Sequence, residues 1–197
     1  MAGKSRVGVL ALQGDVREHA ALLEGLGAEV TLVRRPAELA AVGGLVIPGG
    51  ESTTIDKLSR IFGMQQPIRE AIAGGMPMLG TCAGLIMLAD RVVDAIEGQE
   101  SFGGLDVTVR RNAFGRQTES FEAELVVPEL GERPVRAAFI RGPVVESVGS
   151  DARSLAALAD GRVVAVEQGR ILGLSFHPEI TGETRFHARF LAQISGE

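Results

Sequence analysis

The only cysteine of the chain has the surroundings of a catalytic nucleophile. Cys82 is the centre of Gly80-Thr81-Cys82-Ala83-Gly84, which follows a short apolar stretch and precedes the apolar helical run 85–88. Two glycines remove the side chains that would clash in a sharp strand-to-helix turn, and the turn lifts the central residue out of the sheet. A lone cysteine is usually a small buried hydrophobe, but the framing glycines and the strand–helix context favour a nucleophile.

A nucleophile of this kind needs a base, and the base needs a group that orients it. The sequence His177-Pro178-Glu179 follows the last strand-like run and offers both groups. On an extended chain, residues i and i+2 point to the same side, so the Glu179 carboxylate can hold the His177 ring. Open α/β sheets place their sites at the carboxyl ends of strands, where both motifs lie. We therefore predict a triad of Cys82, His177 and Glu179.

A third glycine-rich segment, Pro48-Gly49-Gly50-Glu51-Ser52-Thr53-Thr54, also lies between a predicted strand and a predicted helix. Adjacent glycines let the backbone approach a ligand and present N–H groups to an anion. Acyl transfer needs such donors for its oxyanion, and we assign this role to the N–H groups of Gly50 and Ala83. An ordinary helix-capping turn is the alternative. A phosphate-binding loop is disfavoured because the G-K-[ST] ending is missing.

The other two histidines are interpreted as structural. His19 lies on the apolar face of the predicted helix 16–26, where a satisfied buried or interface histidine is the better interpretation. His187 lies beside phenylalanines on the last predicted helix, and we assign it no role. The polar segment 110–117 contains arginines that we expect mostly at the surface. One of them could bind a substrate carboxylate through two hydrogen bonds.

The elements that must position these residues follow from the apolar pattern. The first half predicts short strands alternating with helices, one of which begins with a capping-box-like spacing of Thr53 and Asp56. This alternation is typical of a parallel sheet covered on both faces. The predicted strands are 6–12, 29–33, 44–47 and 77–79, and the predicted helices are 16–26, 53–62 and 67–73.

The second half predicts closely spaced strands, a tight hairpin at 167–170 and a terminal helix over 183–194. The strands are 105–110, 121–127, 135–140, 162–167 and 170–176. We therefore predict an α/β fold: one domain over residues 1–197 with three α/β/α layers, and a mostly parallel central sheet with an antiparallel extension.

Composition excludes several classes of function. The chain has 197 residues, 45% of them hydrophobic and 23% charged, and its net charge of −5 disfavours nucleic acid as a partner. One cysteine and three histidines make a structural zinc site improbable, and we predict no metal. The apolar run 7–12 is too short for a signal-peptide core, and no run approaches ~18 apolar residues. The sequence thus predicts a cytoplasmic protein with no membrane span.

Lysine usage argues against one group of cofactor enzymes. Only Lys4 and Lys57 are lysines, and an enzyme that holds an aldehyde cofactor as a Schiff base would need one of them at its centre. Lys4 lies near the terminus and Lys57 on a predicted helix surface. We therefore predict no cofactor.

Taken together and in this order, the motifs resemble those of the class I, triad-type glutamine amidotransferases, whose fold is flavodoxin-like. The resemblance is closer to one branch, the glutaminase subunits of pyridoxal 5′-phosphate synthase, and it covers nearly the whole chain. The elbow and His-Pro-Glu alone identify only the class. The segments that resemble the branch are Leu12-Gln13-Gly14 with Glu18-His19, the 48–54 and 80–84 segments, Arg111-Asn112 with Phe114-Gly115-Arg116-Gln117, Ser120-Phe121-Glu122, Phe139-Ile140-Arg141 and 175–179.

The resemblance implies a glutaminase that hydrolyses L-glutamine to L-glutamate and ammonia. Cys82 would attack the side-chain amide, His177 would move protons and Glu179 would orient His177. The family's glutamine site would map to Gly50, Glu51, Ser52, Arg111, Ile140 and Arg141.

The resemblance also implies a partner. Ammonia would pass through a channel to a separate synthase subunit that makes pyridoxal 5′-phosphate, vitamin B6, with glutaminase subunits arranged around a synthase ring. Binding of the synthase would reorganise the oxyanion loop around Gly49 and Gly50, with Gln13-Gly14 toward the interface.

Three alternatives stay open from the sequence. The chain could be a triad glutaminase that serves another synthase, such as one for anthranilate or a nucleotide. It could be a non-enzymatic regulatory module on a flavodoxin-like scaffold, with Cys82 a buried or redox-sensing thiol. It could also be a cysteine hydrolase of the related three-layer α/β group, although there the base is not usually followed by Pro-Glu.

Overall fold

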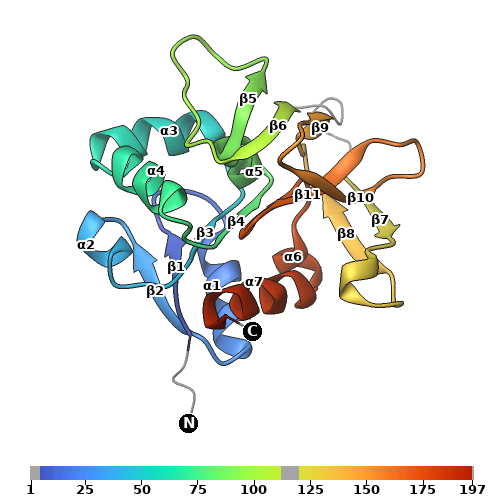
Figure 1. Cartoon of the computed structure of the whole chain (residues 1–197), viewed down its shortest axis with the longest axis horizontal. Helices are drawn as coiled ribbons and strands as arrows, with labels where there is room; N and C mark the ends of the chain where they lie inside the picture. Colours follow the sequence, from blue (N-terminus) through green and yellow to red (C-terminus); the bar gives the residue numbers. More distant parts are fainter. Residues whose placement is uncertain (1–4, 112–119, 197) are drawn as a thin grey trace.

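A parallel block of five strands forms one half of a ten-stranded sheet (Figure 1). The computed structural model describes residues 5–111 and 120–196. The strands of the block pair side by side in the order β2-β1-β3-β4-β12, the strand order of flavodoxin-like folds. They are β1 (Arg6–Leu10), β2 (Glu29–Val33), β3 (Leu45–Ile47), β4 (Met78–Thr81) and β12 (Ile171–Leu174).

The second half of the sheet is mainly antiparallel. From β12 it continues through β11, β9, β6 and β5, with β10 paired to β11. The strands are β5 (Ala89–Val93), β6 (Leu105–Arg110), β9 (Val144–Val148), β10 (Arg153–Ala157) and β11 (Val163–Gln168). β7 (Phe121–Leu125) and β8 (Val135–Phe139) form a separate antiparallel pair, with a 3-10 turn at Pro128–Leu130 between them.

Helices cover both faces of the parallel block. Leu23 of α1 (Val16–Gly25) and Phe186 and Phe190 of α7 (Arg185–Ser195) pack on one face, with α6 (Pro178–Thr181) just before α7. The other face is covered by α2 (Pro36–Leu39), α3 (Ser52–Ile61), α4 (Gln65–Ala73) and α5 (Ala83–Leu88). Alternate residues of each strand enter these two apolar clusters. The predicted three-layer α/β fold with a mostly parallel sheet and an antiparallel extension is confirmed.

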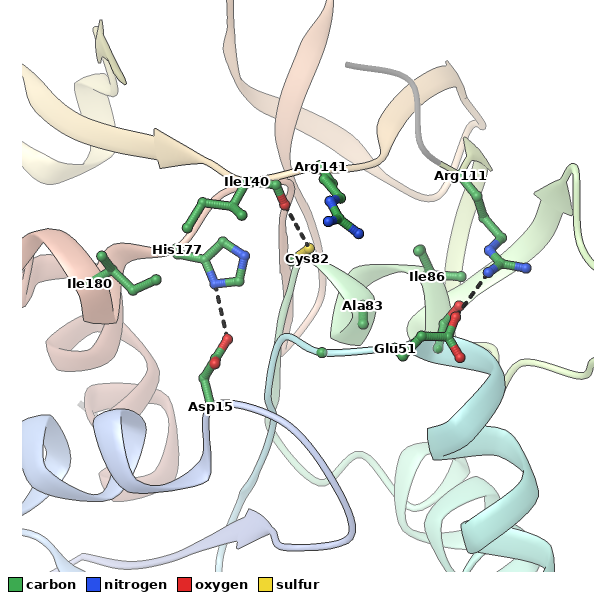
Figure 2. Close-up of a pocket in the computed structure, with 12 residues that line it drawn as sticks. Asp15, Glu51, Cys82, Ala83, Ile86, Arg111, Ile140, Arg141, His177 and Ile180 are labelled. Atoms are coloured by element: carbon green, nitrogen blue, oxygen red, sulfur yellow. Dashed lines mark hydrogen bonds and ion pairs between the residues drawn. The ribbon is translucent and has the colours of Figure 1, made fainter. Parts of the chain in front are cut away.

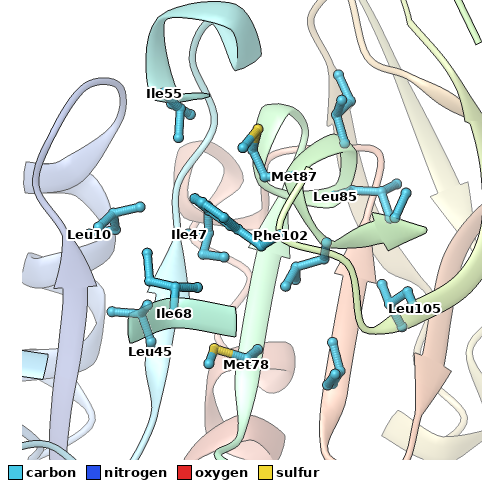
Figure 3. Packing of buried hydrophobic residues seen from close by; sticks show 14 of the residues in the cluster. Leu10, Leu45, Ile47, Ile55, Ile68, Met78, Leu85, Met87, Phe102 and Leu105 are labelled. Carbon is cyan, nitrogen blue, oxygen red and sulfur yellow. The ribbon is translucent and has the colours of Figure 1, made fainter. Parts of the chain in front are cut away.

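The larger core lies between the sheet and α3, α4 and α5 (Figure 3). Ile47 of β3 and Met78 of β4 meet Ile55 of α3 and Ile68 of α4 there. Phe102, from the loop between β5 and β6, fills the same cluster. This packing fixes the carboxyl ends of β3 and β4, from which the two glycine-rich segments leave. Among the described residues, no helix is both long and apolar enough to cross a membrane.

Several predicted elements differ in detail. The hairpin is confirmed: Gln168 pairs with Ile171 across a two-residue turn, and Gly169 has a φ of +55°. The predicted capping box of Thr53 and Asp56 is wrong, because α3 begins one residue earlier and Glu51 is its N-cap. Strands β5, β9 and β10 were not predicted, since their exposed residues interrupt the apolar run.

Candidate active site

The turn between β4 and α5 places Cys82 at the end of the parallel block. Cys82 has a φ of +50°, a backbone conformation that side chains rarely adopt. A Cβ on Gly84 would lie 2.0 Å from the carbonyl oxygen of Ile47, so the turn packs directly onto β3. The Cys82 side chain is nearly buried, and its Sγ lies 3.9 Å from the Ile140 carbonyl oxygen. The predicted sharp strand-to-helix turn is present, and the role of Cys82 as a nucleophile stays a prediction.

His177 and Glu179 meet at the end of β12, but not on an extended chain. His177 is the N-cap of α6, Pro178 is its first residue and Glu179 its second. The turn of the helix brings His177 Nδ1 to 2.7 Å from Glu179 Oε1. The predicted pairing therefore exists, whereas the strand geometry expected for it is wrong.

Burial and pairing act in opposite directions on these groups. Burial lowers the pKa of His177, but pairing with Asp15, Cys82 and Glu179 outweighs burial and raises it to about 12. Burial raises the pKa of Glu179 more than the hydrogen bond from His177 lowers it. Glu179 Oε2 is buried and has no hydrogen-bond partner among the described residues. His177 thus lies between a deeply buried carboxyl group and the thiol.

Asp15 is a further group at His177 that the sequence did not single out. Its Oδ2 lies 3.3 Å from His177 Nδ1, and its backbone N–H donates to the Gly49 carbonyl at 3.1 Å. A Cβ on Gly49 would lie 2.4 Å from His177 Cε1, so only glycine lets the loop pass the imidazole. Because a trans peptide directs C=O and N–H oppositely, the Gly50 N–H points away from Asp15.

The start of α3 carries a charged network. Glu51 caps the helix by accepting the Thr54 N–H at 2.9 Å, and its Oε1 lies 3.0 Å from an Arg111 nitrogen. Burial raises the pKa of Glu51, but hydrogen bonds from Thr53 and Thr54 lower it overall. Gln99 accepts from Arg111 at 2.7 Å and donates to Ser52 at 3.0 Å. Gln99 was missed because it comes from the loop between β5 and β6, where no motif marks it.

One cavity of about 340 Å³ brings nearly all the predicted residues together (Figure 2). Figure 2 shows Asp15 and His177 on one side of Cys82 and Glu51 and Arg111 on the other. Glu179 does not line the cavity but lies buried against His177. The predicted residues that line it are Gly50, Glu51, Ser52, Cys82, Ala83, Arg111, Ile140, Arg141 and His177, and Asp15, Ile86 and Ile180 join them. Asn112 and 114–117 of the quoted motif lie outside the described residues.

A group of three side chains in this cluster could offer metal ligands. Ligand atoms of Asp15, His177 and Glu179 lie within 4.8 Å of one another. The two carboxylates both approach His177 Nδ1, which favours a protonated nitrogen, whereas a metal binds a bare one. The arrangement suits proton handling better than metal binding, and the predicted absence of a metal stays a prediction.

His19 is buried as predicted, but it lies against the candidate triad. Its Nε2 is 3.0 Å from Thr81 Oγ1 and 3.5 Å from Glu179 Oε1, and its Nδ1 is 2.8 Å from His187 Nε2. A signal was available in the sequence, since Asp15 and His19 are four residues apart and share one face of a helical turn.

Comparisons with known proteins identify the family of the chain. A profile of the SNO glutamine amidotransferase family matches residues 9–196. Two relatives are both called pyridoxal 5′-phosphate synthase subunit PdxT. The one from Leifsonia xyli subsp. xyli (strain CTCB07) is 63% identical over 196 residues, which cover 100% of this chain and 99% of that protein. The one from Clavibacter michiganensis subsp. michiganensis (strain NCPPB 382) is 65% identical over 188 residues, covering 95% and 90%.

Solved structures support the same fold. A crystal structure of a glutamine amidotransferase superposes with a TM-score of 0.88 at 45% identity, covering 97% of this chain and 99% of that one. The structure of PurLQS from Thermotoga maritima superposes with a TM-score of 0.67 at 19% identity, covering 98% of each chain. The second likeness concerns the fold alone.

Proposed function

The chain belongs to the SNO glutamine amidotransferase family, and from this premise we propose that its cavity hydrolyses L-glutamine to L-glutamate and ammonia. The observation that carries the proposal is the 2.7 Å contact of His177 Nδ1 with Glu179 Oε1, beside the cavity that Cys82 lines. The proposed nucleophile comes from segment 80–84, and the proposed base and orienting carboxylate come from segment 175–179; the two segments meet at the ends of β4 and β12.

The proposed reaction proceeds in two halves. Cys82 Sγ attacks the side-chain amide carbon of glutamine while His177 holds the thiol proton and passes it to the departing nitrogen. Ammonia leaves, and the γ-glutamyl group stays on sulfur as a thioester. Water, deprotonated by His177, then attacks the thioester carbon and releases glutamate and the Cys82 thiol. Glu179 keeps the His177 ring oriented and stabilises its protonated form.

The remaining residues would bind the substrate. The N–H groups of Gly50 and Ala83 would donate to the oxyanion that forms on the amide oxygen. Glutamine carries both an α-carboxylate and an α-ammonium group, and the paired charges of Arg111 and Glu51 match them. The proposed glutamine site also contains Gly50, Ser52, Ile140 and Arg141, all of which line the cavity.

The relatives' name supplies the partner. We propose that the chain is the glutaminase subunit of a pyridoxal 5′-phosphate synthase, to whose synthase subunit it delivers ammonia in an assembly around a synthase ring. Gln13 Oε1 accepts the Glu51 N–H at 2.7 Å. A partner that binds near Gln13 and Gly14 would therefore act directly on the oxyanion loop. The proposal treats the chain as one cytoplasmic domain, in which the apolar run 7–10 is the buried core of β1.

Glutamate release from L-glutamine by the purified chain, alone and with a pyridoxal 5′-phosphate synthase subunit, tests the proposal. We expect strong stimulation by the synthase and no release by a Cys82→Ala variant that still binds it. Stimulation only by an anthranilate or nucleotide synthase would assign the glutaminase to that pathway instead. If no glutamate is released under any condition, the proposal that the chain is a glutaminase is overturned.

A further inference from the structure

A pair of buried histidines lies directly behind Glu179. His19 of α1 and His187 of α7 are both fully buried, with ring centroids 5.1 Å apart. His19 Nδ1 lies 2.8 Å from His187 Nε2. The other nitrogen of His19, Nε2, lies 3.0 Å from Thr81 Oγ1 and 3.5 Å from Glu179 Oε1. The triad thus continues inward through a second layer that the reaction scheme does not use.

Both rings are neutral. Burial, followed by the neighbouring His187 and His177, lowers the pKa of His19 well below its usual value. Burial lowers the pKa of His187 to about 4. Each ring therefore carries one N–H, and the positions of these two hydrogens decide what Glu179 meets.

The contacts favour one arrangement of the two hydrogens. His187 Nδ1 is buried without a hydrogen-bond partner among the described residues, and a bare lone pair there costs less than an orphaned N–H. The hydrogen of His187 then lies on Nε2 and is donated to His19 Nδ1. The hydrogen of His19 must consequently lie on Nε2, where it points toward Thr81 and Glu179.

We propose that His19 is a positioning residue for the glutaminase reaction, which holds Glu179 as an anion aimed at His177, and that His187 fixes the ring form in which His19 can do so. This inference rests on the proposed function. The pair joins four elements, α1, β4, α6 and α7, and Thr81 directly precedes the nucleophile. His19 would therefore hold Cys82 and Glu179 in a fixed position relative to each other.

The groups around this site determine how the activity depends on pH. Glu179 faces His177, His19 and, more distantly, Asp15, while His177 also faces Cys82. Burial already raises the pKa of Glu179. Removing an N–H beside its carboxylate raises that pKa further, so the acidic limb of kcat/KM moves to higher pH.

Two substitutions of equal length separate positioning from packing. In His19→Gln the amide nitrogen takes the place of Nε2 and keeps a donor, whereas His19→Met fills similar space without one. With the synthase subunit added, we expect His19→Met to lower kcat about tenfold, the size of effect typical for the loss of one polar contact to a charged group. In His19→Met, KM stays within about twofold and the acidic limb of kcat/KM shifts to higher pH. His19→Gln restores kcat and the acidic limb toward the values of the unmodified enzyme.

A double variant tests whether His19 acts through Glu179. In a Glu179→Gln background, His19→Met should change kcat by less than about twofold, because the anion it serves is gone. Two independent tenfold effects that multiply would overturn the proposal. So would a His19→Met enzyme with unchanged kcat and pH profile, or a His19→Gln enzyme as impaired as His19→Met.

Two further comparisons keep the outcomes distinct. If the unmodified enzyme releases no glutamate with the synthase, the proposed function itself is rejected, and the inference about His19 falls with it. If circular dichroism shows that His19→Met is unfolded, His187→Met and His187→Gln repeat the comparison one ring further back. We then expect kcat to fall about threefold in His187→Met and to stay unchanged in His187→Gln. Equal activity of these two variants would overturn the proposal.

Discussion

His177 Nδ1 lies 2.7 Å from Glu179 Oε1, and the carboxylate is fully shielded from solvent. The short contact in a dry environment fixes both the ring form and the direction of His177. A Glu179→Gln variant keeps the shape of the side chain but removes the charge that stabilises protonated His177. We expect kcat to fall by about 10²- to 10⁴-fold with little change in KM.

Steady-state kinetics of glutamate release in the presence of the synthase subunit check this prediction. Glu38→Gln is the matched control, since Glu38 also pairs with a neighbouring side chain, Arg35, but does not line the cavity. A Glu179→Gln enzyme with kcat within threefold of the unmodified enzyme would remove Glu179 from the triad.

The acidic limb of the activity profile should lie at an unusually high pH for a carboxyl group. Because burial raises the pKa of Glu179, folding favours its protonated form. The buried anion therefore costs stability at neutral pH, and the cost disappears on acidification. Activity needs the anion, so kcat/KM falls at a pH above the ~4.3 of an exposed glutamate. Because Glu179 and His177 titrate as a coupled pair, the acidic limb belongs to the pair and not to one residue. A kcat/KM profile that stays flat down to pH 4 would contradict this assignment.

The elbow glycine tests how tightly the nucleophile turn is packed. A Cβ on Gly84 would lie 2.0 Å from the Ile47 carbonyl oxygen, and a backbone atom cannot move aside cheaply. We expect Gly84→Ala to lower the free energy of unfolding by at least about 2 kcal/mol and to displace Cys82. Gly25→Ala is the control, because nothing lies within 4 Å of its Cβ position and alanine suits the helix.

Urea unfolding followed by circular dichroism measures both variants, since the chain has no tryptophan or tyrosine to report by fluorescence. Equal stability of Gly84→Ala and Gly25→Ala would show that the turn tolerates a side chain.

Arg111 should contribute mainly to substrate binding. Its guanidinium is nearly buried and spans Glu51 at 3.0 Å and Gln99 at 2.7 Å. Arg111→Met removes the proposed partner of the glutamine α-carboxylate, so we expect KM to rise about tenfold with kcat within threefold. Arg111→Lys should restore little, because an ammonium cannot span both partners. Arg35→Met, at an exposed ion pair outside the site, should leave KM unchanged, and an equal effect of both methionine variants would contradict the assignment.

Local chemistry explains what the sequence could predict. The turn around Cys82 and the His177-Pro178-Glu179 segment each follow a readable apolar strand, so the place where they meet follows from strand order. The buried apolar runs of β1 and β3 likewise predicted these two strands. Glu179 was placed on the correct partner for the wrong reason, because Pro178 began a helix instead of prolonging a strand.

Long-range contacts explain what the sequence could not predict. His19 and His187 are 168 residues apart, and each alone fits an ordinary buried position. Gln99 comes from a loop without a motif, yet it joins Ser52 to Arg111. Strands β9 and β10 depend on pairing with β6 and β11 rather than on an apolar pattern of their own. Only the folded chain brings these partners together.

Covalent labelling of Cys82 by an electrophilic glutamine analogue tests the central claim most directly. The chain has one cysteine, so intact-protein mass gives the stoichiometry and peptide mapping gives the site. With the synthase subunit present, the account predicts one label per chain, on Cys82, slowed by excess L-glutamine and absent in Cys82→Ala. Labelling that L-glutamine does not slow, or that persists in Cys82→Ala, would contradict a glutamine site built around this thiol.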